Sequence, residues 1–594
     1  MIENIINWGV KNRFLVIIVV IFFSIVSIFF IKDLKLDAIP DLSPVQVIIK
    51  INYPGQSPST IDEQVIYPLV TTFMGTAYVK TVRSQSSFET GLIYIIFKDG
   101  INLYWARSRI LEKLSELIPQ LPKEAVVKLG PDATGVGWIY QYALISKNRS
   151  LDELRSLQDF YIKYALLGID GVSEVASLGG FVKSYEVTID QDKIKEYGLT
   201  YKQIEEAIKR NNKSLGGGAI LENGFEKIID ANGYIKNLNS IENIILKSQN
   251  GLLIRLKDIA SINIVPMPRR GLADLNGEGE VVGGIVIMRQ NANAYEIIKK
   301  VKERLKSLKL DDVKIVEVYD RSSLIEKAIN TLKKTLIEES IIVLLIIFIF
   351  LLHFRSALVI IITLPLIILM TLGLMSFLKI GSNIMSLSGI AISIGAMIDA
   401  SIVMVENAHK YINKNPNANR KIVIINAAKQ VGRPIFFALI LIVVSFLPIF
   451  ALSGQEGKLF TPMAYTKTFA MTIGAIISIL LVPILMIWLI KGKVPKEENN
   501  LLNRFFIYIY KPILKLFIYG RYIVVVLFFV SLAFLYHLYK QQKWEFMPPL
   551  NEESFMYMPV TPPGISIDLA KELTQKTDKI LASFPEVKTV FGKA

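Results

Sequence analysis

The sequence of 594 residues contains no cysteine and only three histidines, His353, His409 and His537. Disulfide bonds and thiolate metal centres are therefore excluded, and a soft metal ion has to be held by methionine or histidine. Acidic residues are also scarce, since 52 Asp and Glu oppose 67 Lys and Arg and leave a net charge of +15. We find no nucleic-acid motif to account for this surplus. The basic residues instead gather beside apolar segments, which is typical of membrane proteins.

Long apolar segments are abundant and predict a multi-pass α-helical membrane bundle. A span needs about 20 mostly apolar residues. The sequence predicts seven spans, at residues 14–31, 336–352, 357–378, 384–407, 435–452, 463–490 and 522–539. The loops 409–433 and 491–521 are basic and are therefore predicted to be cytoplasmic, as is the N-terminus. Residues 501–519 mix aromatic and basic side chains and predict an amphipathic interfacial helix that is interrupted at Pro512.

The polar region 33–335 is predicted to lie on the opposite side of the membrane and to contain two α+β units. The first is expected to have a strand, a helix, a strand pair and a helix at residues 45–52, 58–74, 79–97 and 102–118. This order is typical of a ferredoxin-like split βαβ unit. The second unit is expected at residues 136–146, 151–167 and 172–178, continuing at 283–289, 294–308 and 313–319. The stretch 183–268 between its halves is predicted to be an inserted module.

The last segment, 541–594, parallels the segment that follows the first span. DAIPDL at 37–42 and FMPPLN at 546–551 each follow a span and lead towards a strand and a helix. We interpret residues 541–594 as the start of a second parallel repeat, with a helix at 567–584 and a strand at 587–591. A sheet that stops there would leave an edge unpaired. A truncated product that does not transport, or that acts as a partner of a full-length protomer, is therefore the alternative to a transporter.

The segment 382–409 combines an apolar span with a carboxylate, Asp399. A carboxylate at this depth costs at least about 2.5 kcal/mol, so a functional role is predicted, with a structural hydrogen bond as the alternative. Glu406 follows seven residues later on the same helix face, where it is equally suited to snorkel towards the interface. Met397 and Met404 share the roughly opposite face. The helix thus predicts a proton path on one side and a soft-metal path on the other, unless the methionines only pack.

Longer motifs resemble the resistance–nodulation–division transporters, and among them the heavy-metal efflux branch of the copper/silver exporter type. The matching segments include PDLSPVQVIIKINYPGQSP, RRGLADLNGEGEVVGG, NIMSLSGIAISIGAMIDASIVMVENAHK and MYMPVTPPGIS. The resemblance covers the whole chain and a little more than half of a family member. An exporter of organic compounds from the same superfamily is a further hypothesis. The methionines and the scarcity of acidic residues in the span at 384–407 argue against it.

This resemblance implies a proton-driven antiporter that exports Cu(I) or Ag(I) and needs no bound cofactor. It implies a homotrimer in the inner membrane, with its large domain in the periplasm, that works with a periplasmic adaptor and an outer-membrane channel. Asp399 matches the relay aspartate, to which we add Glu406. The expected metal ligands are the cleft methionine Met558, the pairs Met397–Met471 and Met404–Met486, and Met385 from a third pair. Glu552 matches a carboxylate near the cleft entrance.

Overall fold

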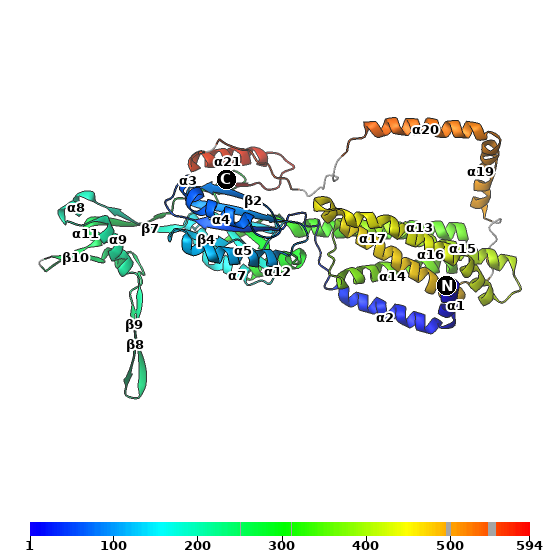
Figure 1. The fold of residues 1–594 in the computed structure, drawn as a ribbon, viewed down its shortest axis with the longest axis horizontal. Coiled ribbons are helices and arrows are strands. Elements are labelled where there is room, and N and C mark those ends of the chain that lie inside the picture. Colours follow the sequence, from blue (N-terminus) through cyan, green and yellow to red (C-terminus); the bar gives the residue numbers. More distant parts are fainter. Residues whose placement is uncertain (250, 311, 493, 495–499, 545–553, 563) are drawn as a thin grey trace.

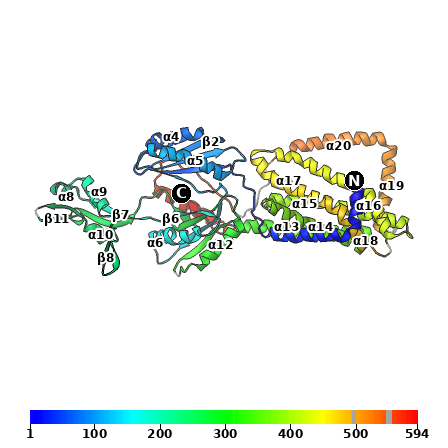
Figure 2. The same ribbon diagram turned by 60° about the horizontal axis from the view of Figure 1, so that its bottom comes forward.

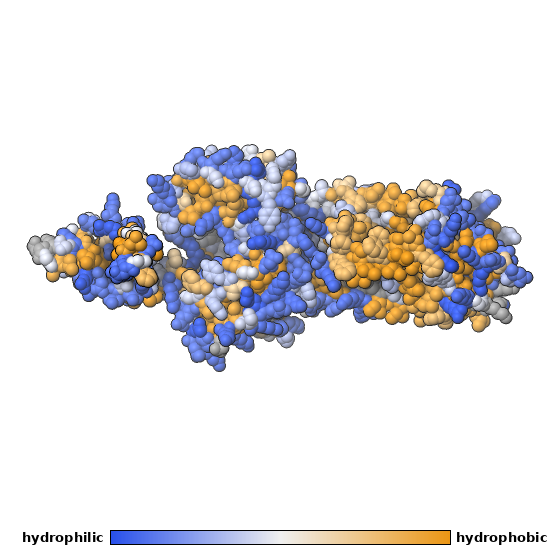
Figure 3. Space-filling model, turned by 90° about the horizontal axis from the view of Figure 1, so that it is seen from below, coloured by the Kyte–Doolittle hydropathy of each residue, from blue (hydrophilic) through white to orange (hydrophobic). Residues whose placement is uncertain are grey.

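The computed structural model describes residues 1–594 except 250, 311, 493, 495–499, 545–553 and 563. The molecule is elongated (Figures 1 and 2). A helical bundle forms one end, two α/β units lie in the middle, and a small module with a projecting hairpin forms the other end. Figure 3 shows a mostly apolar surface over the bundle and a largely hydrophilic one over the middle. This division matches a bundle that sits in lipid and a polar region that sits in water.

The bundle packs against one side of a long helix, α15 (Ile384–Lys414). The other bundle helices are α1 (Ile2–Lys11), α2 (Arg13–Ile31), α13 (Arg321–Leu351), α14 (Phe354–Phe377), α16 (Arg420–Phe446), α17 (Gly454–Leu480) and α18 (Val482–Leu489). A single apolar core joins α14, α15, α16, α17 and α18. The first residue of α15 donates its backbone N–H to Ala38 O at 3.0 Å, which places this end of the helix beside the α/β units. Helix α15 then runs to the far end of the bundle.

Helices α15 and α17 approach each other closely at Gly389. A Cβ atom at this position would lie 2.6 Å from the carbonyl oxygen of Met463 and would overlap the Thr466 hydroxyl. Neither a backbone carbonyl nor a packed helix can withdraw easily. The glycine is therefore what allows α17 to lie against α15.

Replacing Gly389 by alanine is expected to destabilise the bundle by about 1–3 kcal/mol, the usual effect of overpacking. Thermal unfolding of the purified protein in detergent measures this loss. Gly395→Ala is the matched control, because a Cβ atom there meets nothing within 4 Å and alanine favours the helix. Equal melting temperatures for the two variants would contradict the close approach.

The predicted number of spans is not confirmed. Six helices are long and apolar enough to cross a membrane among the described residues: α2, α14, α15, α16 with the 3₁₀ turn that follows it, α17 and α20 (Arg521–Gln541). Helix α13 is not among them, because Lys334, Glu338 and Glu339 interrupt its sequence and leave an apolar part only from Ile341 onwards. The α13 helix instead continues directly from the polar region into the bundle (Figure 1).

Two further predictions about the helices are wrong. The segment 463–490 is not one helix, since α17 ends at Leu480 and α18 begins at Val482. Pro483, which lacks a backbone N–H, accounts for this break. Conversely, α19 (Leu501–Tyr519) continues through Pro512. The carbonyl that Pro512 leaves unpaired belongs to exposed Tyr508, so solvent can satisfy it. Helices α19 and α20 bury no residue. The start of α19 contacts the end of α13, where Phe506 stacks on Phe350 with ring centres 6.3 Å apart, whereas α20 lies apart from the bundle (Figure 1).

Two antiparallel four-stranded sheets form the middle of the molecule. The first has the order β2-β3-β1-β4 and consists of β1 (Gln46–Asn52), β2 (Val79–Ser87), β3 (Thr90–Phe97) and β4 (Val126–Leu129). The second has the order β15-β5-β14-β6 and consists of β5 (Trp138–Ile145), β6 (Val172–Gly179), β14 (Val282–Met288) and β15 (Lys314–Asp320). The predicted strands and helices of both units are present within a few residues of their expected bounds, whereas β4 was not predicted.

Each sheet packs its apolar side against helices. The helices of the first sheet are α3 (Pro58–Ile61), α4 (Tyr67–Met74) and α5 (Leu103–Leu117), and those of the second are α6 (Leu151–Leu157), α7 (Lys163–Leu167) and α12 (Ala294–Ser307). Strand β15 leads into α13, whose first turn is capped by Asp320. Buried Arg321 then forms an ion pair of 2.9 Å with Asp37, in the segment that follows α2. This pair joins the second unit to the exit of the first span.

The inserted module is connected through the paired strands β7 (Lys183–Ile189) and β12 (Ala260–Pro266). It has its own small apolar core. A hairpin of β8 (Ser214–Glu222) and β9 (Phe225–Asn232) projects from it, and all residues of both strands are exposed.

The C-terminal segment returns to the second sheet region. Helix α21 (Ile567–Ala582) lies where a helix is predicted, and β16 (Phe591–Lys593) pairs with β13 (Ala273–Leu275). The backbone of Leu272 and that of Ala594 also exchange hydrogen bonds. The last strand is thus paired on the side that faces β13.

Candidate functional site

Helix α15 presents Asp399 on a face that no described helix covers. Asn383 caps the helix and accepts a hydrogen bond of 3.0 Å from the backbone N–H of Ser386. Asp399 is exposed, and the nearby apolar residues Ile392 and Val403 on the same side of the helix are exposed as well. A carboxylate among apolar side chains in the middle of a membrane span is costly to leave facing lipid.

Glu406 lies on the same face of α15, because seven residues correspond to about two helical turns. The side chain is half-buried, and Lys410 Nζ donates to Glu406 Oε1 at 2.7 Å. Both partners are partly exposed, and they lie one turn apart on one helix. This geometry places Glu406 in an ion pair near the far end of the bundle.

The predicted methionine ligands of the spans lie on the opposite, buried side. Met397, Met404, Met471 and Met486 are almost completely inaccessible and belong to one apolar core. The thioether sulfur of Met397 lies 3.7 Å from the point where a Cβ atom on Gly474 would be. Gly474 is in the turn of α17 that follows Met471. The structure thus brings these four methionines into one core. Their role as metal ligands stays a prediction.

The remaining predicted residues are not brought to this core. Met385 is half-buried in the first turn of α15. Met558 is 70% exposed and belongs to neither a helix nor a strand. Glu552 lies outside the described residues. Among the residues that the structure describes, no group of three or more Asp, Glu or His side chains is arranged to hold a metal ion.

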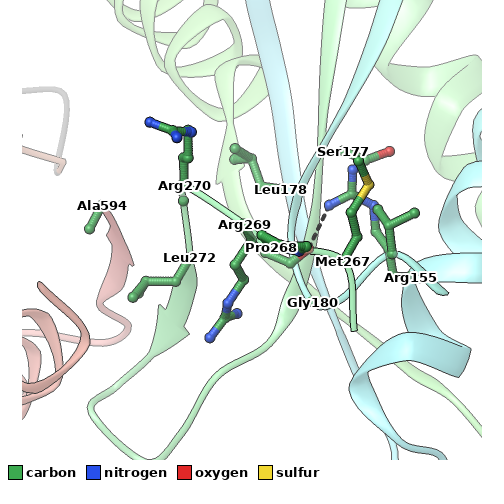
Figure 4. A pocket seen from close by; sticks show the side chains of 13 residues that line it. Arg155, Ser177, Leu178, Gly180, Met267, Pro268, Arg269, Arg270, Leu272 and Ala594 are labelled. Carbon is green, nitrogen blue, oxygen red and sulfur yellow. Dashed lines mark hydrogen bonds between the residues drawn. The ribbon is translucent and has the colours of Figure 1, made fainter. Parts of the chain in front are cut away.

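A cavity of about 270 Å³ lies where the inserted module joins the second unit (Figure 4). Three arginines line it, and each is already engaged, Arg270 with the ring of Phe88 at 4.5 Å from the ring centre. Arg155 donates to Gly179 O at 2.6 Å and pairs with Asp159 at 2.7 Å. Arg269 pairs with Glu280 and lies 4.1 Å from the ring centre of Phe181. These contacts brace the walls, and none of the predicted site residues lines the cavity.

Two polar clusters were not found from the sequence. One joins His353, Ser356 and His409 at the far end of the bundle. Its only sequence signal is that two of the three histidines flank predicted spans. The other joins Asp274 of β13 and Asp578 of α21, which are both buried. Asp274 accepts hydrogen bonds from the backbone of Gly277 at 2.7 Å and from Gln575 at 3.0 Å.

Burial, together with the neighbouring Asp274 carboxylate, raises the pKa of Asp578 to about 7. The pKa lies above its unfolded value of 3.8, so the contact between α21 and β13 is most stable below about pH 4. We expect this stability to fall between pH 4 and pH 7 and to stay constant above pH 7. Asp578→Asn should remove the pH dependence and strengthen the contact at pH 8.

Hydrogen exchange of α21 amides, corrected for the intrinsic rate at each pH, measures this effect. Asp568→Asn is the matched control, because Asp568 is an exposed acid in the first turn of the same helix. The buried acid pair is not responsible if protection in Asp578→Asn still changes between pH 4 and pH 7.

Comparison with known proteins places this geometry in one family. The profile of the AcrB/AcrD/AcrF family matches residues 5–594. The cation efflux system protein CusA of Escherichia coli (strain K12) is 47% identical over all of this chain and 58% of its own length. The putative cation efflux system protein SilA of Salmonella typhimurium is 44% identical, again over 58% of its length. The cobalt-zinc-cadmium resistance protein CzcA of Cupriavidus metallidurans is 33% identical over 57% of its length.

A solved structure described as a heavy metal efflux pump superimposes with a TM-score of 0.85. It is 28% identical, and the match covers 99% of this chain and 57% of that one. The chain therefore spans less than two thirds of the length of these relatives. It is more similar to CusA and SilA than to CzcA, as the resemblance of its motifs to the copper/silver exporter type predicted. The chain belongs to the AcrB/AcrD/AcrF family of transporters and, within it, resembles the heavy-metal efflux branch.

Proposed function

We propose that this protein exports monovalent copper or silver ions in exchange for protons. One observation carries the proposal: α15 bears an acid on an uncovered face at membrane depth and fully buried methionines on its other side. Thioethers are soft, neutral ligands that suit Cu(I) and Ag(I), whereas carboxylates and water bind these ions poorly. The two sides of the helix are thus suited to two different cations.

The metal path that we propose passes between α15, α17 and α18. Met397 lies about 20 Å and Met404 about 30 Å from the start of α15 at 1.5 Å per residue. Met471 on α17 and Met486 on α18 belong to the same core. A series of weak neutral ligands lets an ion bind at each step and still leave. Met385, Met558 and Glu552 are proposed to bring ions to this path from the periplasmic side.

The coupling proton is proposed to bind Asp399, with Glu406 further along the same face. A protonated Asp399 carries no charge and is far less costly in an apolar environment than the carboxylate. Proton binding therefore changes which surface this face can pack against. We propose that a second helical bundle, from the second repeat that the family resemblance implies, covers it.

The assembly that we propose is a homotrimer of the inner membrane, with a periplasmic adaptor and an outer-membrane channel. The β8–β9 hairpin supports self-association, because an isolated hairpin is only marginally stable and this one exposes Leu221 by 85% along with other apolar residues. The distribution of basic residues supports a cytoplasmic N-terminus and periplasmic α/β units. The sheet orders support two ferredoxin-like units, and α13 is proposed as a seventh span.

The test is a proton flux that depends on the metal. Vesicles that contain the full-length protein and a pH-sensitive dye should release an imposed proton gradient on addition of Ag(I) or Cu(I), but not of Zn(II) or an organic cation. A response to organic cations alone would favour the other branch of the superfamily. If the 594-residue chain gives no response but a longer form does, the alternative that the 594-residue chain is a truncated product without transport activity would be favoured.

A further inference from the structure

Two of the three histidines meet at the end of the bundle that lies far from the α/β units. His353 precedes α14, and its Nδ1 atom lies 2.7 Å from Ser356 Oγ. The same hydroxyl oxygen lies 2.7 Å from Nε2 of His409 on α15. Ser356 and His409 are buried, whereas His353 is half-buried. The three side chains thus form a chain of hydrogen bonds that leads from the bundle core towards the surface.

The direction of these hydrogen bonds follows from one acceptor. Nε2 of His353 lies 3.3 Å from the carbonyl oxygen of Lys491, which can only accept, so this nitrogen carries a hydrogen. A neutral imidazole has one N–H, and Nδ1 of His353 must therefore accept from Ser356. The single hydroxyl hydrogen is then used. Nε2 of His409 must consequently donate to Ser356 Oγ. The tautomers assigned from this network make all three bonds point from His409 towards His353 and Lys491.

A chain of hydrogen bonds that all point in the same direction can pass a proton along it. A proton that binds Nδ1 of His409 allows its Nε2–H to move to Ser356, while the hydroxyl hydrogen moves to Nδ1 of His353. His409 is then neutral again, and His353 is an imidazolium that loses a proton to water at the bundle surface. Each transfer breaks one N–H or O–H bond and forms another, and no electron is gained or lost.

The position of the chain fits the proton path of the proposed function, on which this inference rests. His409 lies ten residues beyond Asp399 and three beyond Glu406 on α15. Residues three apart on a helix are neighbours, so Glu406 and His409 lie next to each other. We propose that His409, Ser356 and His353 form the cytoplasmic end of the proton pathway.

Burial, and then the charges around the two rings, keep a proton from resting there. Arg420 of α16 acts on both rings and Arg355 of α14 acts on His353, and both arginines repel an imidazolium. Arg420 also donates to Gly492 O at 2.7 Å, beside Lys491. On α15 the nearby charges are Glu406 and Lys410, which pair with each other. A proton is therefore passed on rather than stored, as a pathway requires.

The first arm of the test examines the hydrogen-bond polarity and does not depend on transport. Nitrogen-15 NMR of the full-length protein labelled at histidine, with signals assigned through His353→Gln and His409→Gln, should show both rings protonated at Nε2. Ser356→Ala should shift both sets of signals. An Nδ1–H tautomer at either ring, or a signal unaffected by Ser356→Ala, would overturn the inference whether or not the protein transports.

The second arm measures proton flux in the vesicles described above. Ser356→Ala keeps both rings but breaks the chain of hydrogen bonds, and it should lower the flux driven by Ag(I) about a hundredfold, the lower end of the range by which single proton-transferring groups act. Ser356→Thr restores the hydroxyl and should restore the flux. The matched control is Ser445→Ala, because this hydroxyl on α16 donates to Ile442 O of its own helix and forms no other hydrogen bond with the described residues.

The two proposals fail in different ways. A wild-type protein without metal-driven flux contradicts the proposed function, and the NMR arm then decides the inference alone. Normal flux in Ser356→Ala overturns the relay and leaves the proposed function intact. A variant that combines His353→Gln with His409→Gln could lose one bound Ag(I) ion while Ser356→Ala keeps both flux and metal. This result would overturn the relay and identify the two rings as metal ligands.

Discussion

Asp399→Asn is expected to lower metal-driven proton flux by about two orders of magnitude, the scale on which loss of one proton-transferring group acts. Asparagine has nearly the same shape but neither binds nor releases a proton near neutral pH. A carboxylate in hydrocarbon costs at least about 2.5 kcal/mol, so the variant should also be as stable as the wild type or more stable. Flux in vesicles and thermal unfolding in detergent measure the two effects on one preparation.

The combination of lost flux and retained stability separates coupling from structure. Asp192→Asn is the matched control, because Asp192 is 96% exposed on α8 (Gln191–Glu196) of the inserted module and should not affect flux. A structural hydrogen bond from Asp399 to a neighbouring helix predicts the opposite pattern, with lower stability and retained flux. Unchanged flux in Asp399→Asn would remove this residue from the proton path.

Met404→Leu is expected to reduce export of Cu(I) or Ag(I) at least about tenfold, since even changes behind a metal ligand have effects of this size. Leucine keeps the volume but removes the sulfur, and such exchanges in a core usually cost less than about 1.5 kcal/mol. Met404 of α15 is fully buried and faces α16. Its methyl carbon lies 3.7 Å from the point where a Cβ atom on Gly432 would be. Uptake of silver into inverted vesicles measures the loss.

The control must be a methionine that only packs. Met375 of α14 is also fully buried but belongs to a separate apolar cluster with Leu34 and Ile390. Met375→Leu should therefore leave export unchanged at a similar cost in stability. Equal export in both variants would mean that Met404 fills space and that the metal passes elsewhere.

Local properties of the sequence determined most of the elements. Alternation and helical periodicity predicted the strands and helices of both α/β units, because each element buries one side against a local partner. Hydropathy predicted the six helices that, in the part of the chain that the structure describes, are long and apolar enough to cross a membrane. The sequence also singled out Asp399, since the cost of a carboxylate in an apolar helix does not depend on the fold.

Sequence periodicity was less informative where competing effects decide whether a helix continues or breaks. Pro512 lies within a continuous helix, while Pro483 lies at a break. The residue is the same in both cases, and the difference is whether its surroundings satisfy the freed carbonyl and tolerate the ring. Helix α13 passes from the polar region into the bundle without interruption, which hydropathy alone does not predict.

Only the tertiary structure decided which distant side chains meet. Ser356 and His409 are 53 residues apart, and Gln575 lies 301 residues from Asp274, yet both pairs are hydrogen-bonded. No periodicity encodes such distances, because they depend on how helices cross and strands pair. The same packing buries the methionines of α15 and leaves Asp399 uncovered. The sequence determined that α15 has two chemically different sides, and the packing of α16 and α17 decided which of them lies inside.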